Sequence, residues 1–100
     1  MMEDNSNVPN IPLPSQKVLN HAFKLAMRDD RPIMCDYYAD SLEKKCMIGV
    51  REDEEKLLVK SEDEYTSPIT KIFKVENEFI ILTENSLYIV SSNIPTCRVS

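Results

Sequence analysis

The chain has 100 residues, of which 42% are hydrophobic and 29% are charged, a composition typical of one globular domain with a single core. Its formal net charge of −5 argues against a broad nucleic-acid-binding surface, because such surfaces carry an excess of Lys and Arg. Gly49 is the only glycine, which excludes a glycine-rich phosphate-binding loop.

The cysteines and the hydropathy pattern indicate where the chain resides. Three widely spaced cysteines without a signal peptide are not the pattern of a disulfide framework. We therefore expect an intracellular, reducing compartment, the cytoplasm or nucleus, or a virion. The longest apolar run, residues 79–82, is far shorter than the ~18 to 20 residues that cross a bilayer, so no membrane span is expected.

Residues 1–14 are predicted to form an extended arm, because three closely spaced prolines disfavour helix. Two interpretations remain open for this arm: a disordered terminus, or a segment that docks on a neighbouring surface through Val8, Ile11 and Leu13. Residues 15–92 are expected to form the single domain, and residues 93–100 a C-terminal tail.

The spacing of apolar residues predicts an amphipathic helix over residues 15–28, with Ser15 as the N-cap. Leu25 falls outside the predicted apolar face. That face is expected to consist of Val18, Leu19, Ala22, Phe23, Ala26 and Met27.

After residues 29–32 the pattern becomes strand-like, since β-branched and aromatic residues replace the helical spacing. Six short strands are predicted, over residues 33–38, 42–50, 56–60, 69–75, 78–83 and 86–91. The predicted fold class is α+β: an N-terminal amphipathic helix followed by an antiparallel β-meander of five or six strands. The strands either close into a small Sm-like or SH3-like barrel or remain a strongly bent sheet.

The C-terminal strands contain an eight-residue repeat, in which residues 76–83 are echoed by residues 84–91. Each repeat begins with Glu-Asn, placed where a two-residue hairpin turn is expected, and asparagine tolerates the positive φ of such turns. This register puts Phe73 across from Ile80, and Ile80 across from Ile89. The strand over residues 78–83 is therefore predicted to be central.

No catalytic, cofactor-binding or metal site is predicted. His21 is the only histidine, and Cys35 and Cys46 lack the spacing of a metal or redox motif. The carboxylates of residues 51–56 and 61–67 are interpreted as solvated loops, since they lack the alternation of a calcium loop. Tyr37 and Tyr88 either line the core or sheet face, or anchor a protein interface.

Two resemblances bear on function. Residues 31–34 leading into residues 37–41 resemble the first hairpin of the Sm-like small-barrel family, and Asn85 matches the Asn of that family's Arg-Gly-Asn motif. This resemblance implies a barrel and an RNA-binding site, although Thr83 and Glu84 replace the Arg and Gly. Residues 56–69 are similar to small uncharacterised proteins of large DNA viruses, which implies a virion or host-interacting protein.

We therefore expect a non-enzymatic protein-interaction or assembly module, with a protein partner or a second copy of the chain as its ligand and a homo-oligomer as one outcome. The alternatives are an Sm-like RNA-binding protein and a small enzyme that acts through carboxylates. The residues expected to contact a partner are Val8, Ile11, Leu13, Tyr37, Tyr88 and Asn85.

Overall fold

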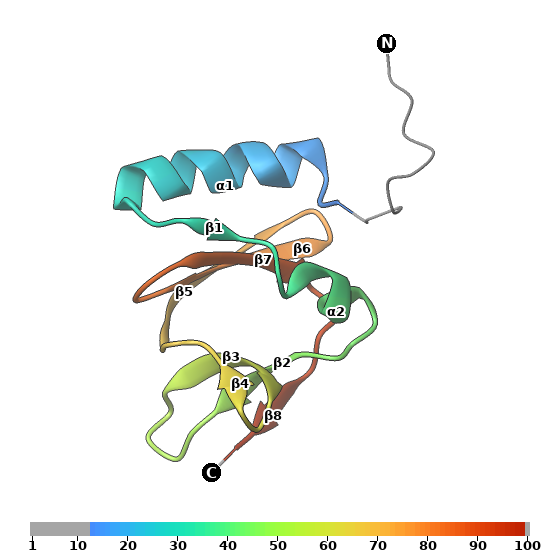
Figure 1. Cartoon of the computed structure of the whole chain (residues 1–100), viewed down its shortest axis with the longest axis vertical. Helices are drawn as coiled ribbons and strands as arrows, with labels where there is room; N and C mark the ends of the chain where they lie inside the picture. Colours follow the sequence, from blue (N-terminus) through green and yellow to red (C-terminus); the bar gives the residue numbers. More distant parts are fainter. Residues whose placement is uncertain (1–12, 100) are drawn as a thin grey trace.

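The structure is a computed structural model and describes residues 13–99. It has the predicted α+β class: helix α1 covers one face of a four-stranded sheet, and a second four-stranded sheet packs on the other face (Figure 1). The first sheet has the strand order β1-β7-β6-β5, and the second sheet has the order β4-β3-β2-β8. The elements are α1 Gln16–Asp29, β1 Ile33–Met34, α2 Tyr38–Leu42, β2 Met47–Val50, β3 Lys56–Ser61, β4 Glu64–Tyr65, β5 Ile69–Val75, β6 Glu78–Thr83, β7 Leu87–Ser91 and β8 Thr96–Arg98.

The strands within residues 13–99 do not close into a barrel, so the Sm-like or SH3-like closure is wrong for this part of the chain. The single bent sheet is also replaced by two sheets. Both sheets are mixed, because β1 runs parallel to β7 and β8 runs parallel to β2. None of the helices in this part of the chain is long and apolar enough to cross a membrane.

Helix α1 begins where the sequence predicts. Ser15 Oγ accepts a hydrogen bond from the amide of Val18 at 3.2 Å, which satisfies one of the unpaired amides of the first turn. Asp30 ends the helix in the left-handed conformation, with a φ of 54°. The predicted helix end is thus confirmed to within one residue.

The buried face of α1 differs from the predicted one. Val18 and Ala22 are fully buried and Leu25 packs with them, whereas Phe23 is 54% exposed and Met27 is 84% exposed. At about 100° per residue, Leu25 lies about 20° around the helix axis from Val18, whereas Phe23 and Met27 lie about 140° and 180° away. The predicted apolar face of α1 extends about 180° around the helix axis, from Val18 to Met27, and the sheet covers only part of it.

The segment that joins α1 to the second sheet is helical where strands were predicted. Only Ile33–Met34 of the predicted strand over residues 33–38 pairs in a sheet, and Tyr38–Leu42 forms α2 instead. The helical turn separates consecutive side chains, so Tyr37 packs into the core between the sheets and Tyr38 into the core beneath α1.

The hairpin register of the first sheet is confirmed. Phe73 pairs with Ile80, and Ile80 pairs with Ile89, so β6 is an inner strand between β5 and β7. The positive φ of the first turn falls on Glu76, at 55°, and not on Asn77 as predicted. In the second turn neither Glu84 nor Asn85 has a positive φ.

The side chain of Thr83 shapes that second turn. Its Oγ1 accepts hydrogen bonds from the amides of Asn85 and Ser86, at 3.2 and 3.1 Å. Its own amide donates to the carbonyl of Ser86 at 2.8 Å. A threonine hydroxyl thus replaces a backbone carbonyl, which explains why the turn needs no residue with positive φ.

The second sheet includes residues that were expected to form a C-terminal tail. Thr96–Arg98 forms β8 and pairs with β2, so the tail predicted over residues 93–100 is wrong for these residues. Ile94, just before β8, is buried in the core between the sheets. The short β4 was also not predicted.

Two apolar cores lie on the two faces of the first sheet. Ile80 and Ile89 point toward α1, and Ile81 and Val90 point toward the second sheet, where they meet Leu58. Since β6 is covered on both faces, every residue of β6 except Phe79 is buried. Central strands buried in this way lack the alternation of half-exposed strands.

Candidate functional site

The longest open edge in the described structure is strand β5, at one end of the first sheet. It has seven residues, of which Thr70, Lys71, Ile72 and Lys74 are exposed. The other three edge strands are β1 and β4, with two residues each, and β8, with three. An edge strand presents unpaired backbone amides and carbonyls that can pair with another chain.

The hydrogen-bond pattern of the β5–β6 hairpin shows which backbone groups face outward. The two-residue loop after Val75 makes Val75 and Glu78 a hydrogen-bonded pair, so bonding to β6 falls on Val75, Phe73 and the alternate residues before them. The amides and carbonyls of Ile72 and Lys74 therefore point away from β6. Ile72 adds an apolar side chain that is 37% exposed.

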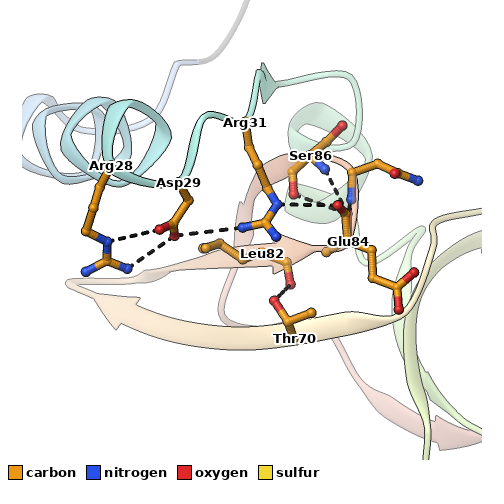
Figure 2. Close-up of polar contacts among 9 residues, drawn as sticks. Arg28, Asp29, Arg31, Thr70, Leu82, Glu84 and Ser86 are labelled. Carbon is orange, nitrogen blue, oxygen red and sulfur yellow. Dashed lines mark hydrogen bonds and ion pairs between the residues drawn. The ribbon is translucent and has the colours of Figure 1, made fainter.

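The start of β5 lies beside the C-terminal end of α1 (Figure 2). A register shift interrupts the β5–β6 ladder between Ile69 and Lys71, and the hydroxyl of Thr70 donates to the carbonyl of Leu82 at 3.2 Å. This side-chain bond holds the strand where the ladder is irregular. Strand β5 is therefore bonded to β6 near its start, through Thr70, as well as at the β5–β6 turn.

A charged cluster fastens α1 to the same corner (Figure 2). Asp29 accepts hydrogen bonds from Arg28 at 3.1 and 3.2 Å, and Arg31 donates to the carbonyl of Glu84 at 3.4 Å. The hydrogen bond from Arg28, with the positive charges of Arg28, Arg31 and Lys71, lowers the pKa of Asp29.

The residues of the predicted arm lie mostly outside the described part of the chain, which leaves Val8 and Ile11 as predictions. Leu13 is described and its side chain is 75% exposed. Its carbonyl accepts a hydrogen bond from the hydroxyl of Tyr38 at 3.5 Å. Leu13 thus lies at the surface beside α2.

Tyr37 and Tyr88 lie in the core between the sheets. Tyr37 is only 3% exposed, and its ring meets the ring of half-buried Tyr88 edge to face at 5.3 Å. The ammonium group of Lys60 lies 4.8 Å from the Tyr37 ring centroid and 3.1 Å from a carboxylate oxygen of Asp40. The packing role of Tyr37 agrees with this burial, and its role at an interface stays a prediction.

Asn85 is exposed at the β6–β7 turn, where its side-chain amide donates to Ser67 Oγ at 3.2 Å. This contact joins two connections at the same end of the first sheet. Of the four predicted contact residues that the structure describes, Tyr37 and Tyr88 contact each other, whereas Leu13 and Asn85 lie at separate places on the surface.

The described residues contain no set of three or more His, Cys, Asp or Glu side chains placed to hold a metal ion. Burial raises the pKa of the Cys46 thiol to about 11, and burial with the nearby charge of Asp36 raises the pKa of Cys35. Both thiols stay protonated at neutral pH, in the form that is a poor nucleophile.

The sequence predicts the residues of β5 correctly but places the strand inside the sheet instead of at its edge. In a simple meander, residues 69–75 would lie between the strands that precede and follow them. In the structure the preceding strands β2, β3 and β4 belong to the second sheet, so β5 has a neighbour on one side only. The available signal is the pair Lys71 and Lys74, because lysines are common on edge strands.

Comparison of the chain with protein-family models, curated proteins and solved structures found no match.

Proposed function

We propose that the chain is a non-enzymatic assembly module that pairs with a second copy of itself through β5. The observation that carries this proposal is the seven-residue open edge, with outward backbone groups at Ile72 and Lys74. Addition of a strand to such an edge is a common mode of protein recognition, in which main-chain hydrogen bonds supply the affinity.

The sequence of β5 favours one register for this pairing. An antiparallel pair with Ile72 opposite its own copy overlaps all seven residues of the strand and forms an isologous two-fold interface. In this register Lys71 lies opposite Phe73, and Lys74 lies opposite Thr70, so no two lysines face each other. Registers centred on either lysine instead place like charges directly opposite one another, which is unfavourable.

The exposed apolar side chain supports the same register. Ile72 would meet its copy across the two-fold axis and bury surface that is exposed in the single chain. Two first sheets would then form one continuous sheet of eight strands, four from each copy.

Sedimentation equilibrium over a range of protein concentrations tests the proposal. The chain is expected to dimerise, and Ile72→Lys is expected to weaken the dimer at least about tenfold, because it places two ammonium groups opposite each other. Met27→Lys on α1 makes a similar apolar-to-charged change at an exposed position and should leave the dimer intact. A monomeric mass at all concentrations would overturn the proposal.

Hydrogen exchange gives a second readout at the level of single amides. The amides of Ile72 and Lys74 should become protected as concentration rises, whereas the amide of Phe73, already bonded to β6, should not change. Protection that rises elsewhere but not at these two amides would place the interface on another surface.

A further inference from the structure

Helix α1 packs on the first sheet with one side, and its opposite side faces away from both sheets (Figure 1). Four exposed residues lie at the centre of this outward side, about 140° to 200° around the helix axis from buried Val18. They are Gln16, Asn20, Phe23 and Met27, and we call them the outer seam of α1. Phe23 and Met27 are both more than half exposed, so the outer seam presents two large apolar side chains to water.

The spacing of the outer seam is that of a surface that pairs with another helix. Its four residues follow one another at intervals of four, three and four positions, as the d and a positions of successive heptads do. Side chains at this spacing form one narrow stripe along the helix, which fits a single neighbouring helix. The sheet-facing side of α1 does not follow this stripe, because its buried residues Val18 and Ala22 lie on the opposite side.

The two polar residues of the outer seam are hydrogen-bonded to each other. The side-chain nitrogen of Gln16 donates to Asn20 Oδ1 at 3.0 Å. This bond satisfies part of the hydrogen-bonding capacity of both amides, which lowers the free-energy cost of covering them. A polar residue within such a seam also fixes the register of the helix that pairs with it.

One flank of the outer seam is basic. Two exposed lysines, Lys17 and Lys24, occupy the e positions of the two heptads, where charged residues select the partner helix. Neither lysine forms an ion pair within residues 13–99. The one carboxylate in α1, that of Asp29, is half-buried and accepts hydrogen bonds from Arg28. The flank therefore remains positive in a chain whose net charge is −5.

These features distinguish between kinds of partner. Antiparallel pairing of two outer seams from two copies would place the e positions side by side, so that Lys17 and Lys24 meet like charges. An anionic membrane is disfavoured by the polar side chains of Gln16 and Asn20 at the centre of the face, and by the net negative charge of the chain. A helix with acidic flanking residues has neither disadvantage.

We propose that the outer seam of α1 binds an amphipathic helix of another protein whose flanking positions carry Asp or Glu. The apolar side chains of that helix pack on Phe23 and Met27, as in other complexes in which a helix presents its apolar face. Its carboxylates pair with Lys17 and Lys24. The site lies on α1 and does not involve the β5 edge, so it does not depend on the pairing of two copies.

Fluorescence polarisation with two labelled helical peptides tests this proposal. Both peptides have three heptads with Leu at the a and d positions and Ala or Gln at b, c and f. The acidic peptide has Glu at every e and g position, and the basic control has Lys at the same positions. The acidic peptide is expected to bind at least about tenfold more tightly than the control. Equal binding of both peptides, or binding of neither, would refute the proposed site.

Charge reversals at matched positions identify the surface. Lys17→Glu with Lys24→Glu should weaken binding of the acidic peptide at least about tenfold and make the basic peptide the tighter ligand. Lys44→Glu with Lys56→Glu changes the net charge equally at exposed positions outside α1 and should change either affinity less than about twofold. Equal effects of the two double variants would show that only net charge matters, and would reject the outer seam.

Truncation of the apolar side chains separates this site from the β5 edge. Phe23→Ala should weaken binding of the acidic peptide at least about tenfold, because it removes an aromatic anchor. Ile72→Ala truncates a partly exposed side chain on β5 and should leave the affinity unchanged. Circular dichroism checks that both variants remain folded. An unchanged affinity in Phe23→Ala, or a loss in Ile72→Ala, would place the peptide on another surface and contradict the proposal.

Discussion

Gly49 lies so close to two valines that a side chain larger than hydrogen would contact both of them. A Cβ at this position would lie 3.0 Å from Val59 Cγ2 and 3.1 Å from Val99 Cγ2, closer than ordinary van der Waals contact. Both neighbours are β-branched, so their χ1 angles give little room for adjustment. The only glycine of the chain thus serves packing between β3 and the C-terminal segment, and not a turn.

We therefore predict that Gly49→Ala destabilises the fold by about 1 to 2 kcal/mol, since overpacking outweighs the strand preference of alanine over glycine. Urea unfolding of Gly49→Ala, Val99→Ala and the double variant measures this effect. Because Val99→Ala removes one of the two clashes, the double variant should be more stable than the sum of the single effects predicts. Additive effects would contradict the proposed contact.

Tyr37 should make stability fall in alkaline solution. Burial, with the negative charge of Glu64, raises its pKa to about 12, above the ordinary value of about 10 expected in the unfolded chain. Between these values the folded state binds more protons than the unfolded state, so stability is fully present below pH ~10 and is lost as the pH rises through ~12.

The variant Tyr37→Phe keeps the ring and removes the ionisable hydroxyl. Its free energy of unfolding should fall less than that of the wild type between pH ~10 and ~12, by up to about 2 to 3 kcal/mol. Other buried groups, such as Cys46, titrate in both proteins and cancel in the comparison. Parallel pH profiles for the two proteins would show that Tyr37 does not carry the effect.

At the scale of elements, Ser15 joins the start of α1 to the β5–β6 turn. Its hydroxyl oxygen accepts from the amide of Val18 at 3.2 Å, and the same hydroxyl donates to Glu76 at 2.8 Å. Ser15→Ala removes both bonds and should cost about 1 to 2 kcal/mol, near the upper end for an N-cap. Ser15→Asn restores an acceptor and should recover part of this loss in thermal or urea unfolding.

The elements that the sequence predicts well depend on neighbours in the chain. The β5–β6–β7 hairpins have two short connections and an eight-residue repeat, so their register follows from local pattern, as the pairing of Ile80 with Phe73 and Ile89 confirms. The elements it misses depend on distant contacts. In helix α2, Ser41 accepts a hydrogen bond from the amide of the distant Ser91 at 2.8 Å, and β8 needs β2 as a partner.

The candidate site was less predictable than the fold. Strand β5 was located to the residue, but its exposure depends on the preceding strands leaving the first sheet, which no local pattern records. The sequence predicts Tyr37 as a contact residue, whereas the structure buries its ring, because aromatic residues fill cores as readily as interfaces.

At the scale of the whole molecule, β6 couples the two cores. Ile80 packs beneath α1 and Ile81 packs against the second sheet, and both side chains are fully buried. A substitution that loosens the packing on one face of β6 also moves its backbone, and that backbone positions the side chains on the other face. We therefore expect the three layers to unfold together in one transition, as small single domains usually do.

Ile81→Ala tests this coupling. The variant removes buried side-chain volume between the sheets and should cost about 2 to 5 kcal/mol in urea unfolding. Ile72→Ala makes the same chemical change at a partly exposed position and, measured below the concentration at which copies associate, should cost less than about 1 kcal/mol. Hydrogen exchange in Ile81→Ala should accelerate for α1 as well as for β2 and β3, because one transition exposes all three. Faster exchange confined to the second sheet would instead show that the two cores unfold separately and that β6 does not couple them.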